Sequence, residues 1–353
     1  MDESLNPFIN ENFWEKPKET QLTLPEVQIP QRLREIHRNY KAINQAHQWE
    51  KRFFLKILSH AIDTINIPDG YKGNGRPSIP LSEKLKICCI KQYNLKGARR
   101  SVYDVEFAKN SGYLFLPIIS DNYFNRINEY LRDKELTPYL QALIKVLSEP
   151  LTQNEHFFAI DGTGFKIGYG KTQYRKIRTD KKAKREYIGL HIIAGVKSKI
   201  IPYAIVSKGY EHDNNFFKPL VREANKIFNI QELYADGAYL SEENFKLCHS
   251  LNIKSYIRPR EDAILEKFGN PIWSNSIDRY MKDLEKGDER RYTLRNNVEC
   301  TFHMIKSVFS DVLRHKIFDA RVNELLARIV CHNIRCLVQA YFKNEIKFPF
   351  GIG

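Results

Sequence analysis

Cysteine, methionine and tryptophan are scarce in this sequence: its 353 residues include 6 Cys, 3 Met and 3 Trp. No two cysteines form a Cys-x-x-Cys pair, so neither a disulfide ladder nor a zinc knuckle is predicted. Cys331, His332 and Cys336 are close in sequence, but at helical spacing they point in different directions, and we expect buried core residues. Isolated thiols of this kind suit a reducing compartment.

Long apolar runs are also missing. No segment is apolar over the roughly 20 residues that a transmembrane helix needs. The first residues, Met1-Asp-Glu-Ser, lack the basic and apolar regions of a secretory leader. The sequence therefore predicts a cytoplasmic protein that makes no contact with a membrane.

The charge balance is strongly basic. Lys and Arg number 56 against 42 Asp and Glu, which gives a formal net charge of +14. Such an excess favours a polyanionic partner, and nucleic acid is the commonest, although a merely basic soluble protein is the alternative. Hydrophobic residues make up 42% of the chain, so it can form a sizeable core, and its length predicts about two domains.

The first part of the chain predicts helices. Residues 1–30 are polar and contain Pro17, Pro25 and Pro30, which indicates a flexible arm. Apolar residues then recur at helical spacing, over residues 31–64, 82–93, 99–107, 121–131 and 135–148. The helix that begins near residue 121 carries Asn125 and Arg126 off its apolar face. Residues 31–150 therefore resemble an all-α, helix-turn-helix-like DNA-binding domain, with an unrelated helical bundle as the alternative.

From residue 151 the pattern changes, and a second domain is expected over residues 151–345. Three antiparallel strands are predicted at 156–160, 187–195 and 200–207. A helix, a strand, a helix and a strand follow, at 216–228, 232–235, 241–250 and 253–257. This order gives an α/β domain with a mixed sheet flanked by helices. Irregular structure is expected over residues 258–289, and helices over 291–306 and 321–342.

Two aspartates follow predicted strands. Asp161 comes at the end of the first strand and Asp236 at the end of the fourth, and these strands are expected to be neighbours. The two carboxylates would then converge and repel each other unless a cation lay between them, and Mg²⁺ is the natural partner. The alternative is that each aspartate is an ordinary turn residue.

The third candidate carboxylate, Glu299, lies in the helix predicted over residues 291–306. Tyr292, Arg295 and Glu299 share one face of that helix, and Lys306 follows two turns later. Glu299 can complete a metal site while its neighbours hold phosphates. Two metal ions about 4 Å apart can activate a nucleophile and stabilise a leaving 3′ oxygen. The alternative is a solvated helix with charge pairs.

These motifs resemble those of the DDE transposases of prokaryotic insertion sequences. The resemblance rests on Asp161-Gly-Thr, Ala-Asp236-Gly-Ala-Tyr, and Tyr292-x2-Arg295-x3-Glu299-x6-Lys306. The last pattern is similar to the Tyr-Arg-Glu-Lys signature of one group of these enzymes at every spacing. Gly75-Arg-Pro and Gly209-Tyr-Glu-His-Asp213 are also typical of the family.

The resemblance implies a ribonuclease-H-like catalytic domain in which Asp161, Asp236 and Glu299 bind two Mg²⁺ ions, with Mn²⁺ able to substitute. It implies that insertion-sequence ends are cut by hydrolysis and that the freed 3′-OH is joined to target DNA. Tyr292 and Arg295 would hold a phosphate beside a flipped base, and Lys306 would contact the DNA backbone. Partners would be double-stranded DNA, as terminal inverted repeats and target, and a second copy of the chain or a larger assembly. The location would be the nucleoid within the cytoplasm.

Three further features carry weaker predictions. Trp273 lies where some relatives place a base-stacking tryptophan, but a packed core residue is the alternative. Asp213 precedes a helix and is expected to cap it. The basic loop of residues 166–185 can contact a DNA backbone or be solvated.

Two other functions remain open at this stage. The chain could be a catalytically silent DNA-binding protein derived from a transposase, or a ribonuclease-H-like nuclease that selects its substrate by structure.

Overall fold

The structure is a computed structural model. It describes residues 31–68, 79–94, 97–116, 123–168, 187–209, 211–260, 269–285 and 292–347. The predicted arm over residues 1–30, the Gly75-Arg-Pro segment and residues 169–186 of the basic loop lie outside the described residues.

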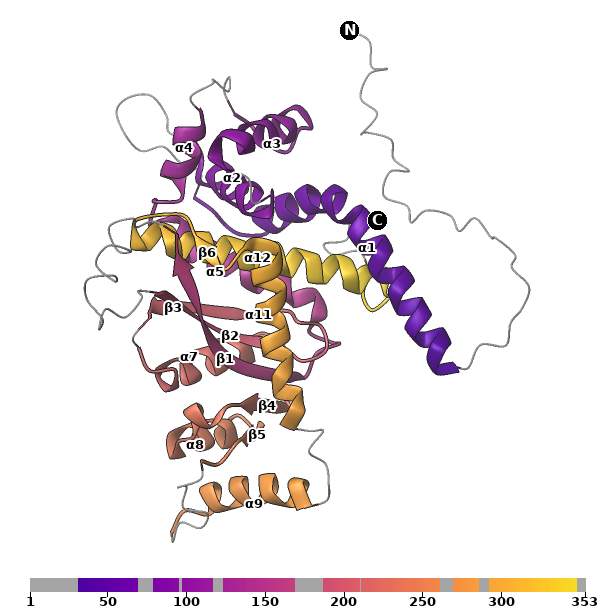
Figure 1. Ribbon diagram of the computed structural model, residues 1–353, viewed down its shortest axis with the longest axis vertical. Coiled ribbons are helices and arrows are strands. Elements are labelled where there is room, and N and C mark those ends of the chain that lie inside the picture. Colours follow the sequence, from indigo (N-terminus) through magenta and orange to yellow (C-terminus); the bar gives the residue numbers. More distant parts are fainter. Residues whose placement is uncertain are drawn as a thin grey trace, which may run out of the picture.

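A mixed β-sheet lies at the centre of the chain (Figure 1). Its main path runs in the order β3-β2-β1-β4-β5, and a sixth strand pairs with β1. The first three strands are antiparallel, whereas β4, β5 and β6 join by parallel pairing. The ribonuclease-H-like α/β sheet that the sequence predicts is confirmed. Its strands are β1 (Phe157–Ile167), β2 (Tyr187–Gly195), β3 (Tyr203–Lys208), β4 (Glu232–Ala235), β5 (Lys254–Ile257) and β6 (Val312–Leu313).

The first strand is much longer than expected. The sequence predicts that it ends at Asp161, but β1 continues to Ile167, and residues 158–166 all pair with β2. Glycine usually interrupts strands, yet Gly162-Thr-Gly164 continues this one. Here the glycines are required by close neighbours instead: a methyl group at residue 164 would lie 3.0 Å from the ring of Tyr187. Asp161 is therefore held inside a paired strand and not in a turn.

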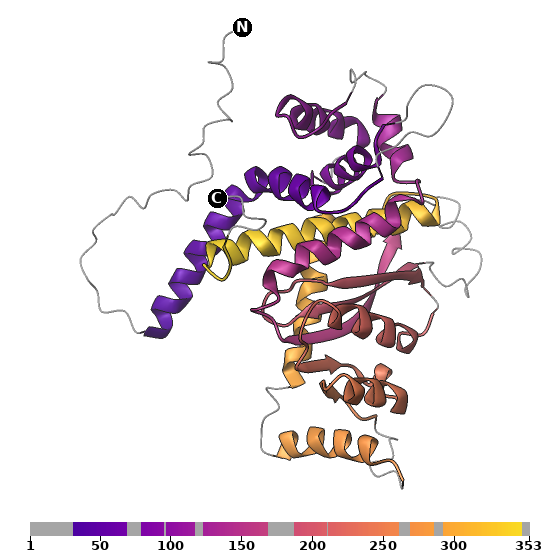
Figure 2. The ribbon, with the colours of Figure 1, turned by 180° about the vertical axis from the view of Figure 1, so that it is seen from behind.

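Helices cover both faces of the sheet. Helix α11 lies over β1 and β2 in Figure 1, and α7 lies over the strands in the reverse view of Figure 2. Successive side chains of β1 point to opposite faces of the sheet, so the strand faces helices on both sides. The helices that follow the meander are α7 (Asn214–Asn225), α8 (Glu242–Ser250), α9 (Pro271–Glu285) and α11 (Asn296–Phe309), with 3₁₀ turns η4 (Gly237–Tyr239) and η5 (Thr293–Arg295).

Helix α9 corrects the expectation of irregular structure over residues 258–289. Asn270 accepts a 3.1 Å hydrogen bond from the backbone N–H of Trp273 at the helix start, and Pro271 occupies the first position, where proline is tolerated. Trp273, Ile277 and Tyr280 form a buried stripe at helical spacing. The charged residues between these positions concealed that periodicity in the sequence.

The N-terminal helices pack on the last helix of the chain. Helix α12 contacts α1, α2 and α5, and α5 runs beside it in both views of the molecule (Figures 1 and 2). Helices α2, α3 and α4 also pack on one another. The bounds are α1 (Gln31–Asp63), α2 (Leu81–Asn94), α3 (Ala98–Asn110), α4 (Tyr123–Tyr130), α5 (Leu136–Ser148) and α12 (Phe318–Phe342), and the 3₁₀ turn η3 (Glu149–Leu151) follows α5.

The interior of α12 is almost entirely buried. Cys331, His332 and Cys336 lie in it as core residues, which confirms the burial predicted from their spacing.

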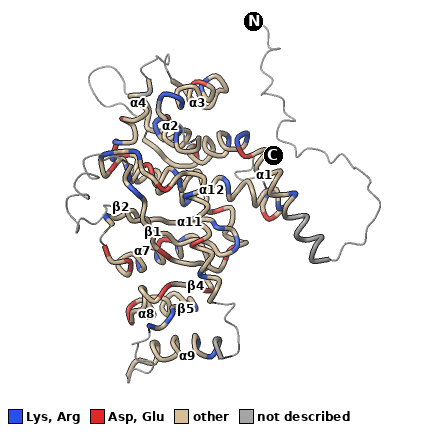
Figure 3. The backbone as a smooth tube through the Cα atoms, viewed as in Figure 1, with Lys and Arg blue, Asp and Glu red and all other residues tan. Residues whose placement is uncertain are grey.

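Basic and acidic residues are interspersed along the chain instead of forming one block (Figure 3). Within the described ranges, every helix is too short or too polar to cross a membrane.

Candidate active site

Asp161 and Asp236 lie side by side at the centre of the sheet. The parallel pairing of β1 with β4 places Ile160 opposite Ala235, so the residue that follows each is an aspartate on neighbouring strands. Oδ1 of Asp161 accepts a 2.8 Å hydrogen bond from the N–H of Gly162. Asp236 begins the turn η4 and accepts a bond from the N–H of Gly237. The convergence that the sequence predicts is therefore confirmed, although Asp161 lies within its strand.

The environment of Asp161 disfavours its charged form. The pKa of the Asp161 carboxyl is raised to about 6, mainly by burial and in smaller part by the charges of Asp236 and Glu299. The hydrogen bond from Gly162 and the charge of Arg295 act in the opposite direction without cancelling the rise. A strongly raised carboxyl pKa beside two other carboxylates is typical of a functional site.

The segment that carries Glu299 is not one helix, as was predicted over residues 291–306. Tyr292 precedes the 3₁₀ turn η5, and the α-helix begins only at Asn296. Glu299 consequently lies in the first turn of α11, where the helix dipole favours a carboxylate. The short 3₁₀ turn still brings Arg295 and Glu299 together, because residues four apart remain neighbours.

Arg295 bridges two of the three carboxylates. Its Nη1 lies 3.5 Å from Oδ2 of Asp161, and its Nη2 lies 2.5 Å from Oε1 of Glu299. The Nε of Arg295 is buried and has no hydrogen-bond partner among the described residues. The guanidinium therefore balances charge at the site and keeps one donor available for a further acceptor.

Tyr292 and Lys306 extend the site on either side of Arg295. The Tyr292 ring packs edge-on against Tyr280, with centroids 5.4 Å apart, and burial raises the pKa of its hydroxyl to about 12. Lys306 donates a 2.6 Å hydrogen bond from Nζ to Oγ1 of Thr163, and burial lowers its pKa. Thr163 was not predicted as a site residue, yet it lies two positions after Asp161 in β1 and shares its face.

The three carboxylates can be compared with the group of ligands that a bound metal ion requires. Among the residues that the structure describes, no three His, Cys, Asp or Glu side chains are grouped closely enough to hold a metal as they stand. Glu299 is turned toward Arg295, and its side chain is 54% exposed, so it has room to reorient. Carboxylate oxygens are the ligands that Mg²⁺ prefers, and Asp161, Asp236 and Glu299 are donors of this kind.

The remaining predicted site residues lie elsewhere. Asn125 and Arg126 are exposed on α4. Trp273 is only 5% exposed and packs edge-on against Phe245, with ring centroids 5.3 Å apart. This is the packed arrangement weighed above against base stacking, and a stacking role would require α9 to move.

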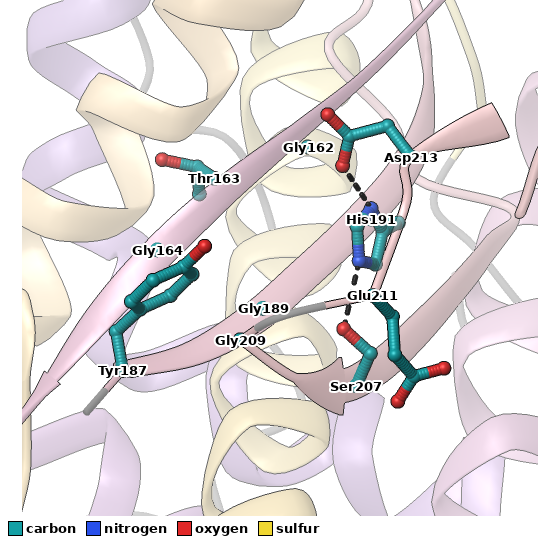
Figure 4. Close-up of a pocket in the computed structure, with 10 residues that line it drawn as sticks. All are labelled: Gly162, Thr163, Gly164, Tyr187, Gly189, His191, Ser207, Gly209, Glu211 and Asp213. Atoms are coloured by element: carbon teal, nitrogen blue, oxygen red, sulfur yellow. Dashed lines mark hydrogen bonds and ion pairs between the residues drawn. The ribbon is translucent and has the colours of Figure 1, made fainter. Parts of the chain in front are cut away.

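A small polar pocket lies on the other face of β1 (Figure 4). Its volume is about 130 Å³. His191 stands between Ser207 and Asp213, with its Nε2 2.9 Å from the Ser207 hydroxyl and its Nδ1 3.3 Å from the Asp213 carboxylate. Sequence reasoning missed His191 and Ser207; a polar residue inside each of two largely buried strands was the available signal. The lining residues are Gly162, Thr163, Gly164, Tyr187, Gly189, His191, Ser207, Gly209, Glu211 and Asp213.

Asp213 itself corrects a prediction. It occupies the position before the first residue of α7, as expected of a cap, but its side chain makes no capping hydrogen bond. Its carboxylate faces His191 instead.

Fold and site together define a ribonuclease-H-like domain with two aspartates on neighbouring strands and a glutamate on a helix packed over them. The family model described as the transposase DDE domain matches residues 152–334, just over half of the chain. The chain belongs to this family, which connects it with DNA transposition and with DNA as a partner. No curated protein and no solved structure matches the chain.

Proposed function

We propose that this protein is a Mg²⁺-dependent transposase of a prokaryotic insertion sequence, of the group with the Tyr-Arg-Glu-Lys signature. It cuts the ends of the element by phosphodiester hydrolysis and joins the freed 3′-OH to target DNA. The observation that carries the proposal is the position of Arg295. Its guanidinium spans Asp161 and Glu299, and its buried Nε, which has no hydrogen-bond partner among the described residues, lies beside a carboxyl whose pKa is strongly raised.

Asp161, Asp236 and Glu299 would hold the metal ions. Bound Mg²⁺ supplies activation of the attacking oxygen and stabilisation of the leaving 3′ oxygen. The protein's own contribution is to hold two carboxylates on adjacent strands, where parallel pairing fixes their separation. When Glu299 turns away from Arg295, the guanidinium is free to hold a phosphate through its planar set of donors.

The neighbouring cations suit a DNA backbone. Tyr292 and Arg295 are proposed to hold the phosphate next to the reacting bond, and Lys306 a more distant phosphate along the strand. Lys306 is held by Thr163, on the same strand as Asp161, so its charge is fixed relative to the carboxylates. The helical part, residues 31–150, is proposed to bind the terminal repeats, with the exposed Asn125 and Arg126 of α4 toward the DNA. Residues 151–345 form the catalytic part, and two or more copies act on paired ends.

The test is cleavage of a supercoiled plasmid that carries the element's own ends, with Mg²⁺ or Mn²⁺. We expect nicked or linear product from the parent chain and none from Asp236→Ala. The matched control is Asp278→Ala, which removes an exposed aspartate of α9. Cleavage by Asp236→Ala at the parent's rate would overturn the assignment.

Two outcomes identify the other readings. Tight binding of the ends without cleavage, under conditions that support a related transposase, would indicate a catalytically silent DNA-binding protein. Equal cleavage of a mixed-sequence RNA–DNA hybrid and of end-bearing DNA would indicate a structure-selective nuclease.

A further inference from the structure

A basic cluster lies where the N-terminal helices meet the central sheet. The connector of residues 314–317 leads from β6 into α12, and β6 pairs with the end of β1. On its other side the connector contacts the N-terminal helices, because Nε2 of His315 lies 3.0 Å from Nζ of Lys91 on α2. The same Nζ donates a 2.8 Å hydrogen bond to Asn128 on α4. One amine therefore joins α2, α4 and the connector.

Four cationic side chains surround His315. Burial, together with the positive charges of these neighbours, lowers the pKa of its imidazole to about 3. The neighbours are Lys91, Arg132, Arg328 and Arg321. Nε of Arg321 also donates a 2.8 Å hydrogen bond to the backbone oxygen of His315. Several like charges around one neutral ring give this junction a positive potential, which attracts a polyanion.

Three carboxylates at the junction each have another cation as partner. The N–O distances of these ion pairs are 2.8, 3.3 and 2.6 Å. The pairs are Lys84–Asp133, Lys134–Asp319 and Arg328–Glu324. These carboxylates are therefore already neutralised, and they do not balance the remaining cations.

Arg132 and Arg314 are two such remaining cations. Both are exposed, and neither forms an ion pair with a residue that the structure describes. Burial lowers the pKa of Lys91, and the charge of Arg314 acts in the same direction, so Arg314 belongs to the same cluster. An exposed guanidinium without a carboxylate partner keeps its planar set of donors available, and that set fits a phosphate group.

The cluster continues the face of α4 that carries Asn125. Asn125 and Asn128 are three residues apart on this helix, so they are neighbours on its surface. Asn128 contacts Lys91, and α4 lies over the start of α12 in both views of the molecule (Figures 1 and 2). Asn323 of α12 donates a 3.0 Å hydrogen bond to the backbone oxygen of Leu131, directly after α4. DNA that contacts Asn125 would therefore pass over the junction.

The connector is also tied to the strand that carries Asp161. Leu313 of β6 pairs with Ile167 of β1, and Arg314 follows Leu313 directly. The part of β1 from Asp161 to Ile167 spans roughly 20 Å, at about 3.3 Å per residue. Duplex DNA rises about 3.4 Å per base pair, so this span corresponds to about six base pairs.

We propose that Arg132 and Arg314 bind the DNA backbone between the part of the terminal repeat that α4 contacts and the bond that is cut. The partner is the phosphate backbone of duplex DNA, which is held here without readout of the bases. This inference rests on the proposed function, because it takes α4 as the element that contacts the repeat and Asp161 as part of the cleavage site. Hydrogen bonds join α2, α4 and the connector, so the two arginines hold the repeat at a fixed distance from the cut.

Ethylation interference with the full chain and a duplex that carries one element end tests the inference. Ethylation removes the charge of a phosphate, so it weakens binding wherever the protein contacts that phosphate. We expect interference at phosphates about six base pairs inside the cleaved bond. In Arg314→Gln this interference is expected to disappear, while interference closer to the centre of the repeat remains.

Fluorescence anisotropy gives a second readout. Arg132→Gln and Arg314→Gln are each expected to bind end DNA several-fold more weakly than the parent, with a slope of log K against log salt concentration lower by about one. The matched control is Arg222→Gln, which removes an exposed arginine of α7 and is expected to bind as the parent does. Circular dichroism checks that each variant is folded.

The variants separate the possible failures. If Arg126→Gln weakens binding of end DNA while Arg132→Gln and Arg314→Gln bind as the parent does, the inference is wrong and the proposed function stands. If the parent binds end DNA no better than random DNA and does not cut it, the proposed function fails, and the inference fails with it.

Discussion

Arg295 and Glu299 form an ion pair at the start of α11, with Nη2 of the arginine 2.5 Å from Oε1 of the glutamate. The same guanidinium lies 3.5 Å from Asp161 through Nη1. Without a metal, it is the cation that separates two of the carboxylates. A divalent ion entering the site must therefore compete with Arg295 for Glu299.

The first prediction follows from this competition. Arg295→Gln leaves the carboxylates without that cation, so the metal-free protein should lose roughly 1 kcal/mol of stability, since Glu299 is half-exposed and solvent weakens the pair. Mg²⁺ should then raise the melting temperature more in the variant than in the parent. Differential scanning fluorimetry in EDTA and in Mg²⁺ measures both values. Arg222→Gln, which removes an exposed arginine on α7, should behave as the parent. An equal Mg²⁺ response in Arg295→Gln and the parent would contradict the prediction.

Lys306 gives a prediction about DNA binding. Each phosphate that a lysine neutralises contributes about one unit to the slope of log K against log salt concentration. Lys306→Gln should weaken binding of end DNA and reduce that slope by about one. Fluorescence anisotropy over a salt series measures it. Lys226→Gln, at the end of α7, is the control, because Lys226 pairs with Glu223 on the surface. A slope unchanged by Lys306→Gln would mean that the lysine only supports Thr163.

Two buried histidines predict sensitivity to acid. Burial lowers the pKa of His315 from 6.5 to about 3, with Lys91 acting in the same direction, and burial lowers that of His332 to about 4. Nε2 of His315 lies 3.0 Å from Nζ of Lys91, which fits a neutral ring that accepts a hydrogen bond. A histidine whose pKa is depressed by folding stabilises the protein fully above pH 6.5, and this contribution is lost as pH falls toward the folded value.

Urea unfolding between pH 7 and pH 4 should show this loss, with each histidine adding a slope of up to about 1.4 kcal/mol per pH unit. His315→Gln keeps a hydrogen-bond acceptor for Lys91. It should lower by one the number of protons whose binding makes the free energy of unfolding depend on pH. Asp161 titrates in the same pH range and changes the stability in the opposite direction, but it does so in both proteins. The difference between the parent and the variant therefore isolates His315. His47→Gln, at an exposed position of α1, should leave the slope as it is. A parent-like slope in His315→Gln would show that His315 is not the group responsible.

A buried ion pair supports the strand beside the site. Arg328 and Glu324 of α12 are 1% and 2% exposed and 2.6 Å apart. Arg328 also donates to the backbone oxygens of Ser310 and Val312, so it fixes β6 against α12. Arg328→Met leaves Glu324 buried without its partner and should cost about 3–5 kcal/mol in urea unfolding.

The double variant Arg328→Met/Glu324→Gln should recover part of this stability, because the unpaired charge is gone. Lys246→Met breaks an exposed pair with Glu242 on α8 and should cost less than about 1 kcal/mol. Equal losses of unfolding free energy in Arg328→Met and Lys246→Met would show that burial of the first pair does not increase its contribution to stability.

Much of the site was predictable from local sequence. Asp161 and Asp236 follow apolar runs that form β1 and β4, and parallel pairing of these strands brings the carboxylates together. The interpretation of the spacing from Tyr292 to Glu299 also holds, although the segment begins with a 3₁₀ turn and not with an α-helical turn. What failed locally was the length of the first strand, because β1 continues to Ile167. Gly162 leaves room for a close approach of side chains from β2 and α7.

Alternating and helical patterns of apolar residues, read from the sequence alone, determined the antiparallel meander, the crossover helices and the order of the carboxylates along the chain. Which side chains of a strand or a helix are buried depends on residues that are close in sequence. The pattern of apolar residues therefore predicts this burial. The tertiary structure alone decided that Arg295 bridges Asp161 to Glu299, that Lys306 is held by Thr163, and that Asp213 faces His191 and not its own helix. These are through-space interactions between residues 4 to 143 positions apart, and charge and hydrogen bonding depend on distance in space.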